Sequence, residues 1–151
     1  MLKLIRTNSG NEDFQALVRL LDQELAIRDG ADHSFYAQFN KIDHIQHVLV
    51  ACLDGEAVGC GAFKPFGEDG VEIKRMFVQP AARGQRIAEQ VLFALEAWAR
   101  EVGAARCVLE TGYKQPEALR LYQRSGYERI PNYGQYAGIE NSACFQKLLI
   151  P

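Results

Sequence analysis

Hydrophobic side chains recur with two different periods along the first third of the chain. Residues 2–6 alternate apolar and polar side chains, which predicts a strand with one buried face. Between residues 14 and 25 the apolar side chains lie three and four positions apart, which predicts an amphipathic helix. Gly30 is expected to end this helix. Residues 32–41 contain three aromatic side chains and are expected to form a second, short helix.

Three short apolar runs follow, and they predict consecutive antiparallel strands at residues 46–53, 56–63 and 71–78. Asp54 and Gly55, between the first two runs, form the sequence signal of a tight hairpin. A glycine-rich turn separates the second run from the third. The middle of the chain is therefore expected to form a three-stranded antiparallel sheet.

The last part of the chain alternates helices and strands. Apolar residues at helical spacing predict a long helix over 87–100. The strand expected at 105–111 should lie parallel to the strand at 71–78, because a helix crosses over between them. The remaining elements are one helix and two strands, at residues 115–126, 127–130 and 142–149. The sequence thus predicts an α+β fold: a mixed, mostly antiparallel, twisted sheet of six to seven strands with helices on both faces.

The loop before the long helix carries a chemical signal of its own. Arg83, Gly84 and Arg86 lead into the helix. The start of a helix presents unpaired backbone N–H groups, and its dipole and the two guanidinium groups add positive charge. This arrangement suits a phosphate or diphosphate, and the alternative is an ordinary strand-to-helix turn.

Composition restricts the classes of protein that the chain can represent. With 151 residues, 48% of them hydrophobic and 24% charged, the chain suits a single globular domain over 1–151. A net charge of −2 argues against a general nucleic-acid binder. The N-terminus lacks the apolar segment of a signal peptide, and no apolar run is long enough to span a membrane. We therefore expect a cytoplasmic location with neither a nucleic-acid nor a membrane partner.

The cysteines and histidines give weak signals. The four cysteines lie in apolar or strand-like contexts without a C-x-x-C pair: Cys52, Cys60, Cys107 and Cys144. Free thiols in a reducing compartment are expected, and a disulfide or a reactive thiol is the alternative. His44 and His47, preceded by Asp43, form an H-x-x-H pair without a third ligand nearby, so no metal site is expected.

Three segments together resemble the GNAT superfamily of acyl-CoA-dependent N-acetyltransferases: residues 71–100, the strand ARCVLET and the segment ALRLYQRSGYERI. The resemblance covers nearly the whole chain in element order and is most specific over 71–130. It implies acetyl-CoA as co-substrate and no metal. The family's pyrophosphate loop reads Gln/Arg-x-x-Gly-x-Gly/Ala, and here the loop is Arg83-Gly84-Gln85-Arg86-Ile87-Ala88. Arg83 and Ala88 fit this pattern, whereas Arg86 stands where a glycine is usual.

The resemblance also implies two further contacts with the cofactor. In the family a strand splays from its neighbour and the gap takes the pantetheine arm, so the backbone of Met76, Phe77 and Val78 would meet that arm. The second family signature is Asn-x-x-Ala-x-x-x-Tyr followed by Gly-Phe/Tyr, and here it runs from Gln115 to Tyr122. Gln115 replaces the usual asparagine, and Tyr122 matches the position that commonly protonates the departing thiolate.

Acetyl transfer from a thioester to an amine by direct attack needs a base, an oxyanion donor and an acid. Glu72 is the first candidate base, because its neighbours on the strand face the other way. Glu110, near the end of its strand, is the second, and it could instead bind the acceptor. A backbone N–H near Phe77 or Val78 would be the oxyanion donor. Tyr122 is the candidate acid, with a core aromatic as the alternative role.

The acceptor is expected to be a small-molecule amine or a peptide amine. The aromatic residues that could line its pocket are Phe35, Tyr36, Phe39, Tyr133 and Tyr136. For the first three, simple packing is the alternative. A non-catalytic acyl-CoA-binding regulatory module on the same fold is the alternative function, and an unrelated phosphate-binding α/β protein is a third. Members of the superfamily often form homodimers, but the sequence locates no interface.

Overall fold

The computed structural model describes residues 1–29, 44–112 and 115–149. The helix expected at 32–41 lies outside them. The elements in chain order are β1 (Leu2–Thr7), α1 (Glu12–Asp29), β2 (His47–Leu53), β3 (Glu56–Phe66), β4 (Gly70–Val78), η2 (Pro80–Ala82), α3 (Ile87–Glu101), β5 (Arg106–Gly112), α4 (Pro116–Arg124), β6 (Glu128–Ile130), η3 (Gly134–Tyr136) and β7 (Ser142–Leu148).

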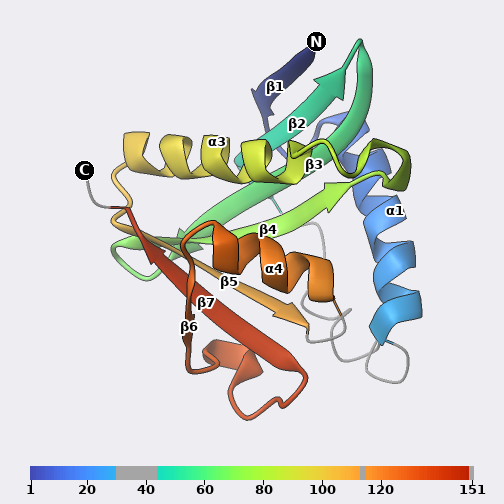
Figure 1. The fold of residues 1–151 in the computed structure, drawn as a ribbon. Coiled ribbons are helices and arrows are strands. Elements are labelled where there is room, and N and C mark those ends of the chain that lie inside the picture. The colour runs from blue at the N-terminus through green and yellow to red at the C-terminus, as the bar shows by residue number, and fades with distance from the viewer. Residues whose placement is uncertain (30–43, 113–114, 150–151) are drawn as a thin grey trace.

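One seven-stranded sheet forms the centre of the molecule, in the order β1-β2-β3-β4-β5-β7-β6 (Figure 1). β4 and β5 are the parallel pair, and the other neighbours are antiparallel. This arrangement confirms the predicted α+β fold and the parallel pairing across the crossover helix. None of the described helices is both long and apolar enough to cross a membrane.

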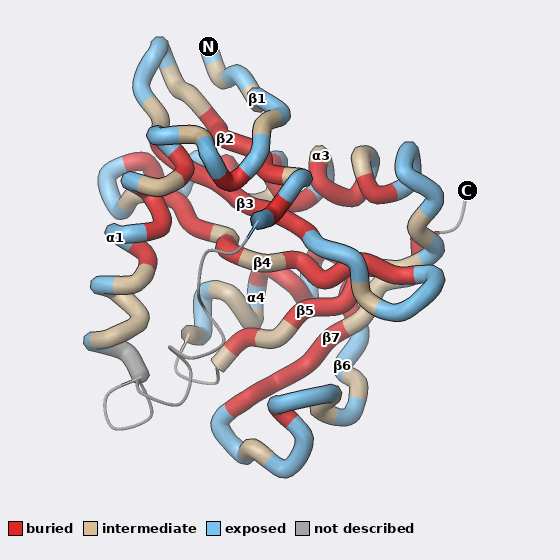
Figure 2. Tube along the Cα trace, turned by 180° about the vertical axis from the view of Figure 1, so that it is seen from behind, coloured by how far each residue is buried: buried red, intermediate tan, exposed pale blue. Residues whose placement is uncertain are grey.

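The helices cover both faces of the sheet. Alternate residues of β2 show this directly: Leu49 packs in the same cluster as α3 and α4, whereas Val48 packs in the cluster that contains α1. Buried residues run through the central strands and along the inner faces of α1 and α3 (Figure 2). The sheet is therefore a middle layer that holds the helices in fixed positions around it.

β4 and β5 separate partway along their length. They pair only from Gly70↔Arg106 to Glu72↔Val108, and beyond that point the two strands diverge (Figure 1). β4 also carries an irregularity next to the divergence. Arg75 adopts a left-handed backbone (φ 61°), and the register between β3 and β4 shifts opposite it. This β-bulge bends the strand and changes which face its side chains occupy.

Three of the cysteines and His47 have packing roles. All four cysteines are free thiols, as expected, and Cys60, Cys107 and Cys144 are buried. The imidazole of His47 stacks on Phe63 at 4.5 Å between ring centroids. Asp43 lies outside the described residues, and no group of three metal-ligating side chains occurs among those that are described.

Candidate active site

Two adjoining cavities occupy the gap where β4 and β5 diverge. The larger, of about 670 Å³, lies between the end of β4, the loop before α3, and α4. The smaller, of about 110 Å³, lies between β4 and β5 beside the end of α1. Six residues line both: Leu21, Leu25, Met76, Gln115, Ala118 and Tyr122. The two cavities therefore adjoin along a wall that includes Tyr122 of α4.

The larger cavity brings together most of the residues that sequence reasoning assigned to the cofactor. Those that line it are Met76, Phe77, Val78, Arg83, Gly84, Arg86, Ile87, Ala88, Gln115 and Tyr122. Gln85 is the exception, since its side-chain amide turns back and donates a hydrogen bond to the Ala82 carbonyl at 3.4 Å. The residues on either side of Gln85, Gly84 and Arg86, therefore line the cavity, whereas Gln85 does not.

Arg86 takes the backbone conformation that glycine favours, at the position where the family pattern has a glycine. It adopts a left-handed backbone (φ 61°) immediately before α3, a conformation that glycine reaches more easily. The conformation costs a non-glycine residue about 1–2 kcal/mol. The side chain is 82% exposed and lies 3.8 Å from Glu89, so it turns away from the loop backbone. The helix start therefore keeps the backbone form that a glycine would give.

Arg83 makes two contacts within the protein. Its Nε donates to the Val78 carbonyl at 2.9 Å, and a terminal nitrogen donates to Glu24 Oε2 at 2.8 Å. Arg83 thus fastens the end of β4 to α1. A guanidinium has five N–H donors, so these contacts leave donors that can face the cavity.

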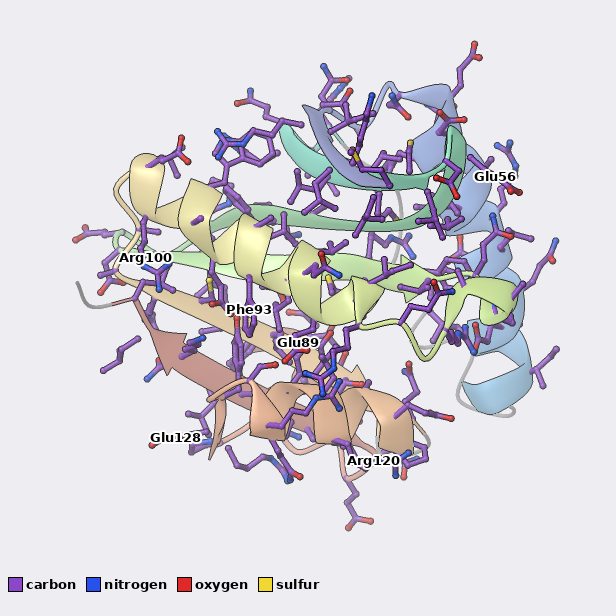
Figure 3. The ribbon with its side chains drawn as sticks, turned by 45° about the horizontal axis from the view of Figure 1, so that its top comes forward. Glu56, Glu89, Phe93, Arg100, Arg120 and Glu128 are labelled. Carbon is purple, nitrogen blue, oxygen red and sulfur yellow. The ribbon has the colours of Figure 1, made fainter. Side chains whose placement is uncertain are left out.

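Sequence reasoning missed two further cations of the larger cavity. Arg120 and Arg124 lie one turn apart on α4 and both line it. Glu89, on the side of α3 that faces α4, lines the cavity opposite them (Figure 3). The sequence contained a signal for this pair, because Arg120 and Arg124 are four residues apart and residues at that spacing share one helix face.

The smaller cavity contains both candidate bases. Glu72 is only 4% exposed, and the Tyr133 hydroxyl donates a hydrogen bond to its Oε2 at 2.7 Å. Val71 and Ile73 pack in the core on the opposite face, as the alternation predicts. Glu110 reaches the same cavity from β5. The structure thus brings two carboxylates from neighbouring strands to one site.

The tyrosines near these carboxylates remain protonated. Burial raises the pKa of Tyr133, and the charge of Glu72 raises it further, so its hydroxyl stays a donor. Tyr136 packs at 5.9 Å from Tyr133 between ring centroids. Neither ring lines either cavity, so both support the site from behind Glu72. Tyr36 and Phe39, the other candidates for the acceptor pocket, lie outside the described residues, as does Phe35.

Tyr122 is well suited to hold a proton. It is 6% exposed and packs at 5.8 Å from Tyr127 and 6.4 Å from Phe145 between ring centroids. Burial raises the pKa of its phenol, and the nearby charge of Glu110 raises it further. Tyr122 is therefore neutral at physiological pH and can act as a proton donor.

Comparisons with known proteins agree with this geometry. Residues 14–127 match the model of the acetyltransferase (GNAT) family. The aminoalkylphosphonate N-acetyltransferase of Salmonella typhimurium is 33% identical over 136 residues, which cover 85% of this chain and 84% of that protein. The IAA acetyltransferase of Azospirillum brasilense is 43% identical over 89 residues, and the chain spans 58% of its length. A Klebsiella pneumoniae crystal structure assigned to the acyl-CoA N-acyltransferases has a TM-score of 0.82 and 32% identity, covering 99% of both chains.

Proposed function

Because this chain belongs to the GNAT family of acetyltransferases, we propose that it transfers an acetyl group from acetyl-CoA to a primary amine by direct attack in a ternary complex. The position of Tyr122, where the two cavities meet, is the observation that carries the proposal. One cavity then holds the donor, the other holds the acceptor, and the reacting atoms meet beside the phenol.

The larger cavity has the features needed to hold acetyl-CoA. The loop before α3 supplies backbone N–H groups for the diphosphate, and among the described residues no atom lies within 4 Å of the position that a Cβ on Gly84 would take. Arg83 lines the cavity from this loop, and Arg120 and Arg124 line it from α4. The backbone of residues 76–78 is placed to meet the pantetheine arm. When bound, acetyl-CoA supplies the activated acetyl group.

The residues of the smaller cavity have complementary roles in the transfer. Glu72 accepts the proton that the amine loses as the new C–N bond forms, directly or through water. Tyr122 donates its proton to the sulfur as the C–S bond breaks. A backbone N–H near Phe77 or Val78 stabilises the charge on the carbonyl oxygen. Glu110 is the second candidate base.

The cysteines favour direct attack over a covalent enzyme intermediate. Burial raises the pKa of the Cys60 thiol to about 12, and burial also raises the pKa of Cys144. Neither thiol lines either cavity. A thiol is a nucleophile only as the thiolate, so neither is suited to accept the acetyl group. The free thiols also support a reducing compartment, and we propose a cytoplasmic location.

A thiol-release assay with acetyl-CoA tests the function. The purified chain is incubated with acetyl-CoA and a panel of amines that includes amino acids, peptides with a free N-terminus and, since the Salmonella relative is named for them, aminoalkylphosphonates. Release of CoA with at least one amine, together with the acetylated product by mass spectrometry, supports the proposal. Binding of acetyl-CoA with no release across the panel would instead indicate a regulatory acyl-CoA-binding module.

A further inference from the structure

The bulge in β4 places two cations side by side on the wall of the smaller cavity. In a regular strand Lys74 and Arg75 would point to opposite faces of the sheet. At the bulge, Arg75 instead reaches Asp22 of α1 (Nη1 to Oδ1, 2.8 Å), while Met76 takes the position against α3 beside Gly61. Lys74 and Arg75 therefore share the face that also carries Glu72.

Arg75 has hydrogen-bonding capacity that the protein does not use. Its side chain is 3% exposed, and Asp22 is its partner through Nη1. Among the residues that the structure describes, its Nη2 has no hydrogen-bond partner. A buried charged donor without a partner costs free energy, so a ligand that accepts a hydrogen bond from it is favoured. Arg75 lines the smaller cavity, so its guanidinium contributes positive charge to the wall of that cavity.

Lys74 adds a second cation that lacks full hydration. Burial lowers the pKa of its ammonium, and the charges of Glu72 and Glu110 partly oppose that effect. The cavity wall thus carries two carboxylates and two cations, Lys74 and Arg75. Glu72 and Lys74 lie two residues apart on one strand, about 6–7 Å between Cα atoms. The two signs of charge are therefore close enough for one small molecule to meet both.

We infer that the acceptor is a small amine that carries an anionic group a few atoms from its nitrogen, with Lys74 and Arg75 binding the anion while the amine faces Glu72 and Glu110. A peptide N-terminus has an anion at that distance only where its first residue is Asp or Glu, so the inference favours small-molecule acceptors. It rests on the proposed acetyl transfer and specifies which amines undergo it. A carboxylate and a phosphonate satisfy the same chemistry.

Matched amines test the inference. Propylamine, 3-aminopropanoate and 2-aminoethylphosphonate share a short spacer and differ in the terminal group, and 1,3-diaminopropane carries a cation instead. We expect kcat/KM for one or both anionic amines to exceed that of propylamine about 10- to 100-fold, as hydrogen bonds to charged groups allow. The better anionic amine identifies the anion. Equal values for propylamine and both anionic amines, or a preference for the diamine, would overturn the inference.

Variants separate recognition of the anion from a structural role. Arg75→Gln and Lys74→Gln should each raise KM for the anionic amine about tenfold, should leave KM for acetyl-CoA within twofold of the wild type, and should change kcat/KM for propylamine less than kcat/KM for the anionic amine. Lys64→Gln is the matched control, because Lys64 is an exposed lysine paired in register with Glu72 and does not line the cavity. An equal loss for all amines would assign Arg75 and Lys74 to structure and refute the inference. Absence of CoA release with every amine would refute the proposed function itself.

Discussion

Tyr122 combines a buried position with a place on the wall of both cavities. Its ring packs against those of Tyr127 and Phe145, and the residue still lines both cavities. Burial raises the pKa of the phenol and so keeps its proton on the oxygen. Because Tyr122 lines both cavities, that proton lies beside both of them. A core aromatic and a proton donor were alternative roles at the sequence level, and in the fold they are compatible.

Tyr122→Phe should therefore reduce turnover with little effect on binding. Phenylalanine keeps the packing and removes the proton, so kcat should fall about 100-fold, at the low end for general acids because a thiolate leaves readily. The dissociation constant of acetyl-CoA, measured by calorimetry, should change less than threefold. An unchanged kcat would remove Tyr122 as the acid.

Glu72→Gln tests the candidate base. Glutamine keeps an oxygen that can accept the hydrogen bond from Tyr133 and cannot take a proton from the amine. We expect kcat/KM at pH 7 to fall at least 100-fold. The loss should shrink as pH rises, because more of the amine is then already neutral in solution.

Glu110→Gln is the matched variant, since Glu110 lines the same cavity from β5. If Glu72 is the base, Glu110→Gln should affect the KM of the acceptor more than kcat. The reverse pattern, with the larger loss of kcat in Glu110→Gln, would make Glu110 the base and leave Glu72 an acceptor-binding residue.

At the scale of elements, the strand-loop-helix unit from β4 to α3 is where the sequence was most informative. The parallel pairing of β4 and β5 followed from one crossover helix, because such connections leave few topologies. The bulge at Arg75 could not be predicted. Strict alternation places the Arg75 side chain on the face of the sheet that α3 covers, whereas it contacts Asp22 of α1 on the other face. The contact between Tyr133 and Glu72 joins residues 61 positions apart, and no local pattern encodes it. Local periodicity thus predicted the elements, whereas the composition of the site depends on their packing.

Arg83→Glu tests this unit as a whole. The change removes a cation from the cavity and places a carboxylate beside Glu24, so both the proposed anion site and the link between β4 and α1 are lost. The dissociation constant of CoA should rise at least tenfold, an effect of about 1.4 kcal/mol. Pantetheine, which lacks the diphosphate, should lose much less.

Arg100→Glu is the control for Arg83→Glu, since Arg100 is an exposed arginine in the last turn of α3, far along the helix from the loop (Figure 3). It makes the same change in net charge and should leave CoA binding within twofold of the wild type. If Arg83→Glu bound CoA as tightly as this control does, Arg83 would not belong to the diphosphate site.

At the scale of the whole molecule, one buried network ties the α3 layer to the far part of the sheet. Glu96 of α3 is buried, and it accepts hydrogen bonds from Lys147 of β7 at 2.8 Å and from the Tyr127 hydroxyl at 2.9 Å. Removing one partner of a buried ion pair leaves a charge without compensation. The network therefore fixes α3, which carries the proposed diphosphate site, to β7 and to the segment that follows α4.

Lys147→Met should accordingly destabilise the fold while leaving every cavity residue in place. We expect a loss of about 2–4 kcal/mol, which corresponds to a fall in Tm of about 5–15 °C for a domain of this size. Calorimetry provides the measurement. Lys3→Met, at an exposed position of β1, is the control and should shift Tm by less than 2 °C. A double variant with Glu96→Gln should recover part of the loss, and its failure to do so would argue against a direct ion pair.

The buried phenols make stability depend on alkaline pH. Burial raises the pKa of Tyr122, Tyr127, Tyr133 and Tyr136 in the folded chain, whereas an unfolded tyrosine ionises near pH 10. Above that pH the unfolded chain releases protons that the folded chain retains. The stability from these phenols is thus fully present below about pH 10 and lost as the pH rises.

Urea unfolding between pH 8 and pH 11 measures this loss. The free energy of unfolding should begin to fall near about pH 8.5, where thiols ionise in the unfolded chain, and fall more steeply near about pH 10, where each retained phenol adds a slope of up to about 1.4 kcal/mol per pH unit. The buried thiols of Cys60 and Cys107, each with a pKa near 12, act in the same direction. Tyr136→Phe isolates one phenol, because Tyr136 is 1% exposed and lies outside both cavities. Above pH 10 the free energy of unfolding of this variant should fall less steeply with pH than that of the wild type, by about 1.4 kcal/mol per pH unit. Identical slopes would mean that Tyr136 ionises equally in the folded and unfolded chains.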